Sequence, residues 1–325
     1  MSVLERSESL LLSQLPAPIG QGGAAAGAEP VSFRDKETRS EDIRREIDTA
    51  VAGMGTGQRW QEWLDVSQRF HSYSLNNQIL IMLQNDKATR VAGFHKWKEF
   101  DRSVNKGASA IWITAPMIKR VKDLDANGNP KFGPDGKPVW KEAMIGFKTV
   151  PVYDVSSTSG KPLPELPVVE FDRSSGQAPE GMHEDLAGQV ERHGYTLEYR
   201  DLGTDDHIPD GYTDPAGKKV VINTAHSHAH QANTLAHELA HIECGHLART
   251  GEYHTRAGGQ RGTMEVEAES VSYVISRRYG MAQAWSFGYI DGWAMGDTEK
   301  VRKTADVVVK AADRILKNIP RFKTT

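Results

Sequence analysis

The sequence predicts an α+β protein in two parts: an N-terminal domain of mixed helices and strands, and a helix-rich C-terminal domain. Three observations support this class. Apolar residues recur with helical spacing between residues 40 and 84, and short strand-like runs follow up to residue 155. Helical spacing then returns after a proline-rich segment. A chain of 325 residues is long enough to give each domain its own core.

The N-terminal elements follow from composition and capping. Residues 1–39 are rich in Gly, Ala and Pro over much of their length, and we expect a disordered leader there. Ser40 is a suitable helix N-cap because Glu41 and Asp42 follow it in the first turn. A further amphipathic helix is expected over residues 74–84.

Strands and turns dominate the next stretch. We expect strands at residues 91–97, 110–115 and 147–155, with a hairpin loop rich in Asp, Asn and Gly at residues 123–137. A stiff, proline-rich linker separates the two domains. The expected boundaries are residues 1–39 for the leader, 40–160 for the N-terminal domain, 161–168 for the linker and 169–325 for the C-terminal domain.

The C-terminal domain is expected to open with a helix at residues 182–193 and a strand at 195–199. A hairpin around residues 214–217 and a strand at 219–222 precede the next helix. A strand in this position can pair with an extended peptide substrate, or it can be ordinary sheet structure.

The helix that follows carries the motif HExxH. His237 and His241 are four residues apart, so their imidazoles project from the same helix face. This geometry suits two nitrogen ligands of a tetrahedral zinc ion. Glu238 lies beside them, where its carboxylate can accept a proton from an attacking water and pass it to a leaving amine.

The third ligand is expected further along the chain. A pattern with a third histidine, HExxHxxGxxH, is excluded because Gly245 and His246 each miss its register by one residue. The Glu-x-x-Ala pattern that begins at Glu265 resembles the third-ligand helix of gluzincin-type metallopeptidases, so Glu265 is the expected ligand. Glu269 would orient a histidine from the outer shell. The alternatives are that Glu267 or Glu269 is the ligand, or that Glu265 is only a solvated carboxylate.

Composition narrows the setting of the protein. The formal net charge of −3 gives no global indication of nucleic-acid binding, but residues 86–122 are locally basic and residues 165–214 are locally acidic. The single cysteine, Cys244, excludes an internal disulfide and is expected to be a packed thiol. Together with the lack of a signal-like apolar run, this favours a cytoplasmic protein without membrane contact.

The basic segment also contains aromatic rings. Mixtures of cations and rings hold single-stranded nucleic acid, because cations follow the phosphates and rings stack on the bases. The simpler interpretation of Trp97 is a residue on the buried face of a strand. The candidate DNA-binding residues are Arg90, Lys96, Trp97, Arg102 and Lys106.

Four segments of this region resemble the N-terminal domain of ArdC-type antirestriction proteins. They are FHSYSLNNQ (residues 70–78), ATRVAGFHKW (88–97), RSVNKG (102–107) and VYDVSST (152–158). The resemblance implies a single-stranded-DNA-binding domain followed by a zincin-like metallopeptidase domain, related to the ImmA/IrrE type, with Zn²⁺ as cofactor. In that family, members linked to plasmids and phages protect incoming DNA from restriction. The long leader and an insertion near residues 125–137 depart from the family pattern.

Three functional hypotheses follow. The first is a single-stranded-DNA-binding antirestriction protein whose zinc peptidase cleaves DNA-bound restriction or repressor proteins. The second is a non-enzymatic antirestriction protein with structural zinc. The third is a cytosolic regulatory protease of the ImmA/IrrE type, whose basic domain contacts proteins. In an enzyme, Tyr253 or His254 is a candidate to stabilise the oxyanion, although both can be ordinary loop residues.

Overall fold

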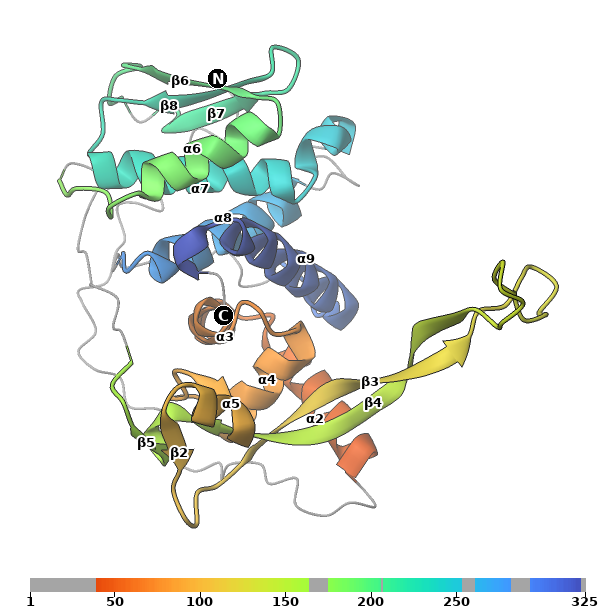
Figure 1. Cartoon of the computed structure of the whole chain (residues 1–325). Coiled ribbons are helices and arrows are strands. Elements are labelled where there is room, and N and C mark those ends of the chain that lie inside the picture. Colours follow the sequence, from red (N-terminus) through yellow and green to blue (C-terminus); the bar gives the residue numbers. More distant parts are fainter. Residues whose placement is uncertain (1–38, 164–174, 206, 253–260, 282–292, 323–325) are drawn as a thin grey trace. The chain divides into compact units, whose positions relative to one another are not determined.

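The computed structural model describes residues 39–163, 175–205, 207–252, 261–281 and 293–322 (Figure 1). Helices and strands are mixed, so the expected α+β class is confirmed. Most of the expected leader and residues 164–168 of the expected linker lie outside the described residues. Close contacts divide the described chain into unit 1, which contains residues 44–78 and 163–322, and unit 2, which contains residues 39–43 and 79–162.

Unit 1 is mainly helical. Its central helix α7 packs against α8, and α8 packs against α9 and α3. The helices that lie wholly in this unit are α3 (Gly57–Arg69), α6 (Met182–Arg192), α7 (His228–Glu243), α8 (Arg261–Arg278) and α9 (Thr298–Lys317), with short 3-10 helices η2 (His246–Glu252) and η4 (Pro320–Phe322). Two further helices, α2 (Arg39–Gly53) and α4 (Leu75–Gln84), cross the division between the units in sequence.

Helix α3 belongs to the expected N-terminal domain by sequence, but its contacts place it in unit 1. Trp60 and Trp63 are fully buried, and the Trp60 indole N–H donates to Ser270 Oγ of α8 at 2.8 Å. Periodicity shows that a helix has an apolar face, but it does not show which element covers that face. Here α8 covers it, so the contacts group this segment with the C-terminal part of the chain.

A small mixed sheet completes unit 1. Its strand order is β6-β8-β7, with β6 (Thr196–Arg200) parallel and β7 (Gly211–Asp214) antiparallel to the central strand β8 (Lys219–Asn223). The side chains of β8 are buried where the sheet covers α7 (Figure 1). The strands and the hairpin expected here are confirmed, and β7 is an edge strand.

Unit 2 contains two small antiparallel sheets, one of order β1-β4-β3 and one that pairs β2 with β5. Helix α5 and the 3-10 helix η1 accompany them. The elements are β1 (Val91–Ala92), α5 (Phe94–Glu99), β2 (Arg102–Val104), β3 (Ile111–Lys122), β4 (Trp140–Asp154), η1 (Val155–Ser157) and β5 (Thr158–Gly160).

The expected strand at residues 91–97 is wrong beyond its first two residues. Gly93 is the N-cap of α5, and Trp97 lies in that helix with its ring buried. The Trp97 indole N–H donates to the carbonyl of Tyr153 at 2.9 Å. Over seven residues, the alternation of Val91, Gly93, His95 and Trp97 does not distinguish a strand from a short helix, so periodicity alone cannot decide between them.

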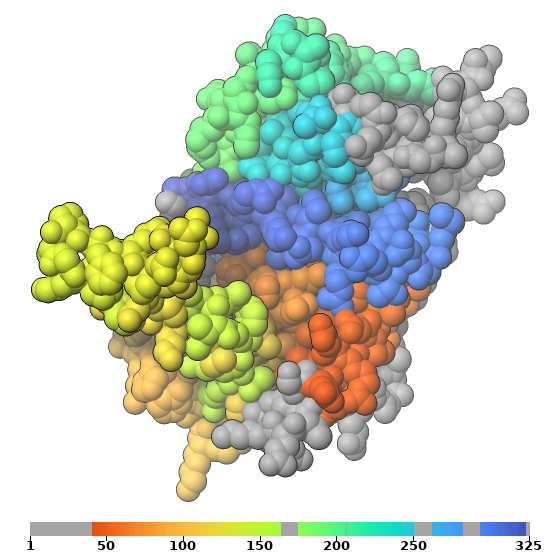
Figure 2. All heavy atoms as spheres, turned by 90° about the vertical axis from the view of Figure 1, so that its right-hand side faces the viewer, coloured from red at the N-terminus to blue at the C-terminus, as the bar shows by residue number. Residues whose placement is uncertain are grey.

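The β3–β4 pair is longer than expected. It forms a two-stranded ribbon with one register shift between Met117 and Ile118, and it stands clear of the rest of unit 2 (Figures 1 and 2). Its outer part has no buried face, so the alternation that marks a half-buried strand is missing from the sequence there. Isolated bridges continue the pairing within the expected loop at residues 123–137. Among the described residues, no helix is both long and apolar enough to cross a membrane.

Candidate metal centre

Helix α7 carries the HExxH motif through the core of unit 1. Ser227 caps the helix by accepting a hydrogen bond from the backbone N–H of His230. Leu235 and Leu239 are fully buried, which fixes the rotation of the helix. That rotation turns His237 and His241 together toward α8, because residues four apart share a face.

The structure brings together the three expected ligands. The two Nε2 atoms of His237 and His241 are 3.1 Å apart. Glu265 Oε2, from α8, lies 3.6 Å from the first of these atoms and 3.9 Å from the second. Ligands about 2.0–2.2 Å from a tetrahedral metal are separated from one another by roughly 3.4 Å. The two imidazoles and one carboxylate therefore fit a divalent cation such as zinc.

Outer contacts hold the first histidine ring in place. His237 Nδ1 lies 3.1 Å from Glu269 Oε2, where the sequence expected an orienting carboxylate. A metal-binding imidazole usually donates its second N–H in this way, which fixes the tautomer and the ring orientation. Glu269 therefore contacts the Nδ1 side of His237, while Glu265 approaches the Nε2 atoms of both rings.

A second chain of contacts, which the sequence analysis missed, runs behind the other ring. His241 Nδ1 lies 2.8 Å from His246 Nδ1, and His246 Nε2 lies 2.8 Å from Glu267 Oε2. His246 and Glu267, which form this relay behind His241, are both buried. Glu267 thus pairs with His246, whereas Glu265 is the carboxylate grouped with His237 and His241. A histidine five residues after the motif was the only signal in the sequence.

The pKa values of the two histidines shift in opposite directions. Burial, together with the adjacent His237, lowers the pKa of His241 to about 3. Burial also opposes protonation of His237, but the carboxylates of Glu265 and Glu269 outweigh it and raise the pKa of His237 well above its usual value. The carboxylates around this pair thus favour a positive charge at His237.

Glu238 faces the same space. Burial raises the pKa of its carboxyl group, and this effect is opposed by His237 and by a hydrogen bond from Thr213. Thr213 Oγ1, on the edge strand β7, donates to Glu238 Oε2 at 2.6 Å. The carboxylate is therefore held in one orientation beside the two rings.

A pocket of about 540 Å³ opens above these groups. One wall consists of the proposed ligands and Glu238, and another comes from β7 and its flanking residues; His246 and Leu247 also line the pocket. Tyr212, on that wall, is partly exposed. The pocket-lining residues of the β7 wall are Pro209, Gly211, Tyr212, Thr213 and Pro215.

The expected DNA-binding residues do not form one exposed cluster. The stacking role proposed for Trp97 is wrong, because its ring is only 1% exposed. Arg102 stabilises the fold: its guanidinium donates to the hydroxyl of Thr158 and to the carbonyl of Lys161. Lys96 pairs with Glu99, while Lys106 is exposed. The oxyanion candidates Tyr253 and His254 lie outside the described residues.

The ribbon carries exposed groups that the sequence analysis did not select. Trp140 and Phe147 are 44% and 60% exposed, and Arg120 lies over the Trp140 ring at 5.6 Å from its centroid. The sequence signal that could have found them is that apolar residues do not alternate with polar ones along these two long strands. The other large apolar residues exposed in and next to the ribbon are Ile118, Leu124, Phe132, Val139, Met144 and Ile145.

Comparisons with known proteins match the two halves of the chain to different domains. Residues 39–153 match the family model of the N-terminal domain of anti-restriction factor ArdC. Residues 190–273 match the IrrE N-terminal-like domain, a peptidase family model. An uncharacterized Bacillus anthracis protein, pXO2-81, is 23% identical over 286 residues, covering 78% of this chain and 47% of the relative. The chain thus spans about half the length of that curated relative.

Two solved structures are also similar, both of the antirestriction ArdC protein from the R388 plasmid. The metal-free crystal structure is 19% identical with a TM-score of 0.44, covering 78% of this chain and 87% of that one. The Mn(II)-bound structure is 19% identical with a TM-score of 0.47, covering 86% and 99%. The chain thus matches, in this order along the sequence, an ArdC N-terminal domain and an IrrE-like peptidase domain, and it is similar to ArdC-type antirestriction proteins.

Proposed function

We propose that this chain is an antirestriction-type protein that binds single-stranded DNA and cleaves proteins with a zinc-dependent peptidase centre. His237, His241 and Glu265 hold the cation, and Glu238 is the general base. The observation that carries the peptidase half is the convergence of the three donor atoms beside Glu238, at a pocket with a strand edge in one of its walls.

The chemistry follows from the residues around this pocket. When bound, a zinc ion would polarise the peptide carbonyl and increase the acidity of a water molecule. Glu238 accepts the proton from the attacking water and transfers it to the leaving amine. Thr213 holds the Glu238 carboxylate, while Glu269 and His246 fix the orientation of the two histidine rings.

The edge of β7 provides a place for the substrate. Within the described residues it pairs with β8 on one side only, so the backbone groups on its other side can bind an extended peptide. Gly211 keeps this strand close to its neighbours, since a Cβ there would lie 2.6 Å from Thr234 Cγ2 and 2.9 Å from the carbonyl of Val221. The strand and the motif helix thus approach closely, with the catalytic groups facing the strand.

The peptidase proposal is tested with Glu238→Gln in the full-length chain, with Glu191→Gln on the exposed face of α6 as the matched control. Candidate restriction and repressor proteins are incubated with each variant, with and without single-stranded DNA. We expect cleavage by wild type and the control, and a loss of about 10²–10⁴-fold for Glu238→Gln with its bound zinc retained. Equal cleavage by both variants would remove Glu238 as the base. A zinc-loaded wild type that cleaves nothing would favour the non-enzymatic alternative.

The ribbon supports the DNA-binding half. Alternate residues of a strand share a face, so Pro116, Ile118, Arg120 and Lys122 lie on one side of β3. The register pairs Lys122 with Trp140 and Pro116 with Phe147, which places both exposed rings on that same side. One face of the ribbon therefore carries two separated rings with cations beside them, and this combination suits unpaired bases and phosphates.

The charge of the ribbon favours an anionic partner. Two of its cations, Lys131 and Lys141, neutralise Asp123 and lower the pKa of that carboxyl to about 2. The other basic side chains outnumber the remaining acids Asp125, Asp135 and Glu142. Arg90, Lys96 and Lys106 remain proposed as further phosphate contacts. The cations of the ribbon and its tip are Lys119, Arg120, Lys122, Lys131, Lys137, Lys141 and Lys148.

DNA binding is tested by titrating the full-length chain with a labelled single-stranded oligonucleotide over a salt series. We expect affinity to fall with salt and to fall about 5- to 100-fold in Trp140→Ala and in Phe147→Ala, because each ring that stacks on a base contributes 1–3 kcal/mol. Met295→Ala, an exposed apolar residue of unit 1, is the control. Unchanged binding by both ring variants would exclude the ribbon. No salt-dependent binding by wild type would favour the regulatory-protease alternative.

A further inference from the structure

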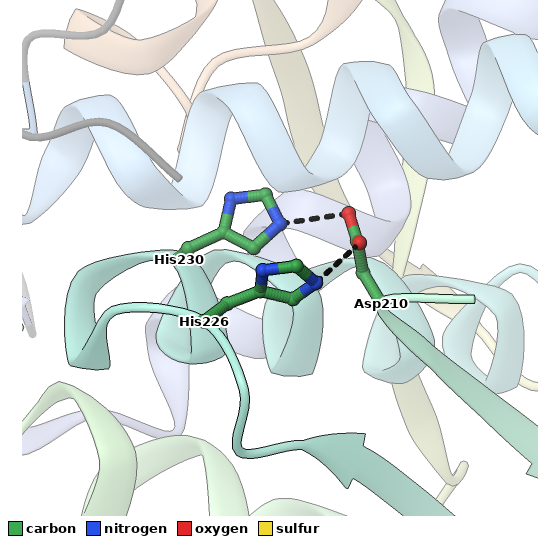
Figure 3. Close-up of side chains that lie close together, drawn as sticks. All are labelled: Asp210, His226 and His230. Atoms are coloured by element: carbon green, nitrogen blue, oxygen red, sulfur yellow. Dashed lines mark hydrogen bonds and ion pairs between the residues drawn. The ribbon is translucent and has the colours of Figure 1, made fainter. Parts of the chain in front are cut away.

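A second cluster of histidine and carboxylate groups lies at the beginning of α7, outside the centre described above. His226 Nε2 lies 3.0 Å from one carboxylate oxygen of Asp210, and His230 Nε2 lies 2.7 Å from the other. Both rings point their Nε2 edges at this carboxylate (Figure 3). Asp210 directly precedes β7, while His226 precedes α7 and His230 lies in its first turn.

We infer that Asp210, His226 and His230 form a second divalent-cation site, with zinc as the best-suited ion. Two imidazole nitrogens and one carboxylate are a zinc donor set, and their donor atoms lie within 4.8 Å of one another. The spacings of 2.7 and 3.0 Å need to widen by about 0.7 and 0.4 Å to reach the roughly 3.4 Å between ligands of a tetrahedral ion.

Burial and position also suit a cation. The two histidine side chains are only 9% and 10% exposed, whereas that of Asp210 is 30% exposed. The carboxylate side thus leaves access for an entering ion and for water as a remaining ligand. His230 precedes His237 by seven residues, which is about 10 Å along a helix, so the two sites hold separate ions.

The two sites differ in their outer contacts, and this sets their relative affinity. At the catalytic centre, Nδ1 of each ring has a partner. Nδ1 of His230 is buried and, within the described part of the chain, has no hydrogen-bond partner. Loss of an outer-shell partner typically lowers metal affinity 10–100-fold. The second site is therefore the weaker of the two.

Occupation of this site would affect the pocket. Asp210 adjoins the pocket-lining residues of β7, and its backbone carbonyl accepts a hydrogen bond from Asn223 N–H of β8 at 2.8 Å. A cation shared by Asp210 and the two histidines links the start of β7 to the start of α7. The strand edge proposed for the substrate and the motif helix would then be fixed to one another.

The test is a Zn²⁺ titration of the full-length, metal-free protein, with bound zinc counted at each free zinc concentration. Wild type is expected to bind two equivalents, the second at 10–100-fold higher free zinc. Asp210→Asn, which keeps the shape of the side chain, and His226→Ala are each expected to lose only the weaker equivalent. His237→Ala loses only the tighter one. The control is His193→Ala, since this histidine is exposed and pairs with Glu243 outside both clusters.

Binding of a single equivalent by wild type at every concentration overturns the second site. Two equivalents that persist unchanged in both Asp210→Asn and His226→Ala overturn it as well. Neither outcome concerns the proposed peptidase, whose failure would appear as a zinc-loaded protein that cleaves nothing. The zinc count and the cleavage assay thus report on the two proposals separately.

Discussion

The candidate metal centre of unit 1 and the ribbon of unit 2 differ in how far their polar and aromatic side chains are buried. At the centre, Glu238 and His241 are buried, and each has a polar partner. On the ribbon, rings such as Trp140 are exposed and cover no core. The first arrangement holds groups rigidly for chemistry, and the second leaves apolar surface available to a partner.

The role of a tryptophan or a histidine in this protein cannot be inferred from the residue type until the exposure of its side chain is known. Trp97 and Trp140 both stand beside basic residues in the sequence. One is a core residue and the other is available to stack on a base. The same holds for histidines: His71 faces one carboxylate, that of Asp313, whereas His237 belongs to a group of three side chains that could hold a metal ion.

The largest expected effect separates the two tryptophans. Trp97→Ala should lower the free energy of unfolding by about 3–5 kcal/mol, because it removes a buried ring and leaves a cavity. Trp140→Ala should change it by about 0.5 kcal/mol or less, as exposed substitutions do. Chemical denaturation of the full-length variants measures both. A stable Trp97→Ala protein with weakened DNA binding would reverse the comparison.

The next effect concerns a buried histidine that is not a ligand. Burial, aided by Arg278, lowers the pKa of His71 to about 4, although Asp313 lies 3.6 Å away. The folded state therefore resists protonation more than the unfolded chain, whose histidine has a pKa near 6.5. The stabilisation is complete above pH 6.5 and is lost as the pH falls, by about 2 kcal/mol at pH 5 and about 3 kcal/mol at pH 4.

Unfolding free energies between pH 7 and pH 4 check this expectation. In His71→Phe, the part of the pH slope that comes from the histidine should disappear, since the phenyl ring does not titrate. Parallel slopes for the variant and the wild type would show that His71 is protonated equally well in both states.

A smaller effect is expected behind the metal centre. His246→Phe removes the outer partner of His241 and should lower the affinity of the tighter zinc site about 10–100-fold. Competition with a chromophoric chelator measures this affinity. His193→Phe, an exposed substitution on unit 1, should leave it unchanged. If His246→Phe binds zinc as tightly as wild type, His246 and Glu267 contribute to core packing and do not support zinc binding.

The smallest effect concerns single phosphate contacts. Lys106→Ala should weaken single-stranded DNA binding a few-fold at moderate salt and lower the slope of log affinity against log salt by about 1. The matched comparison is Lys303→Ala on α9, a similarly exposed lysine in unit 1. An unchanged slope in Lys106→Ala would confine the proposed phosphate contacts to other cations.

The sequence by itself determined whatever depends on local spacing. The HExxH motif brings two imidazoles to one face because a helix repeats every 3.6 residues, and this holds wherever the helix packs. The strands around residues 195–222 were predictable for the same reason, since period-two patterns with turn residues are local signals.

Only the tertiary structure decided which elements meet and which surfaces stay exposed. Glu265 approaches the histidines, and His246 lies between His241 and Glu267, because α8 packs on α7. The meeting of Asp210 with His226 and His230 depends on the close approach of the segment before β7 to the start of α7. Such contacts, like the burial of Trp97, depend on packing between distant segments, and residue spacing along one segment carries no information about them.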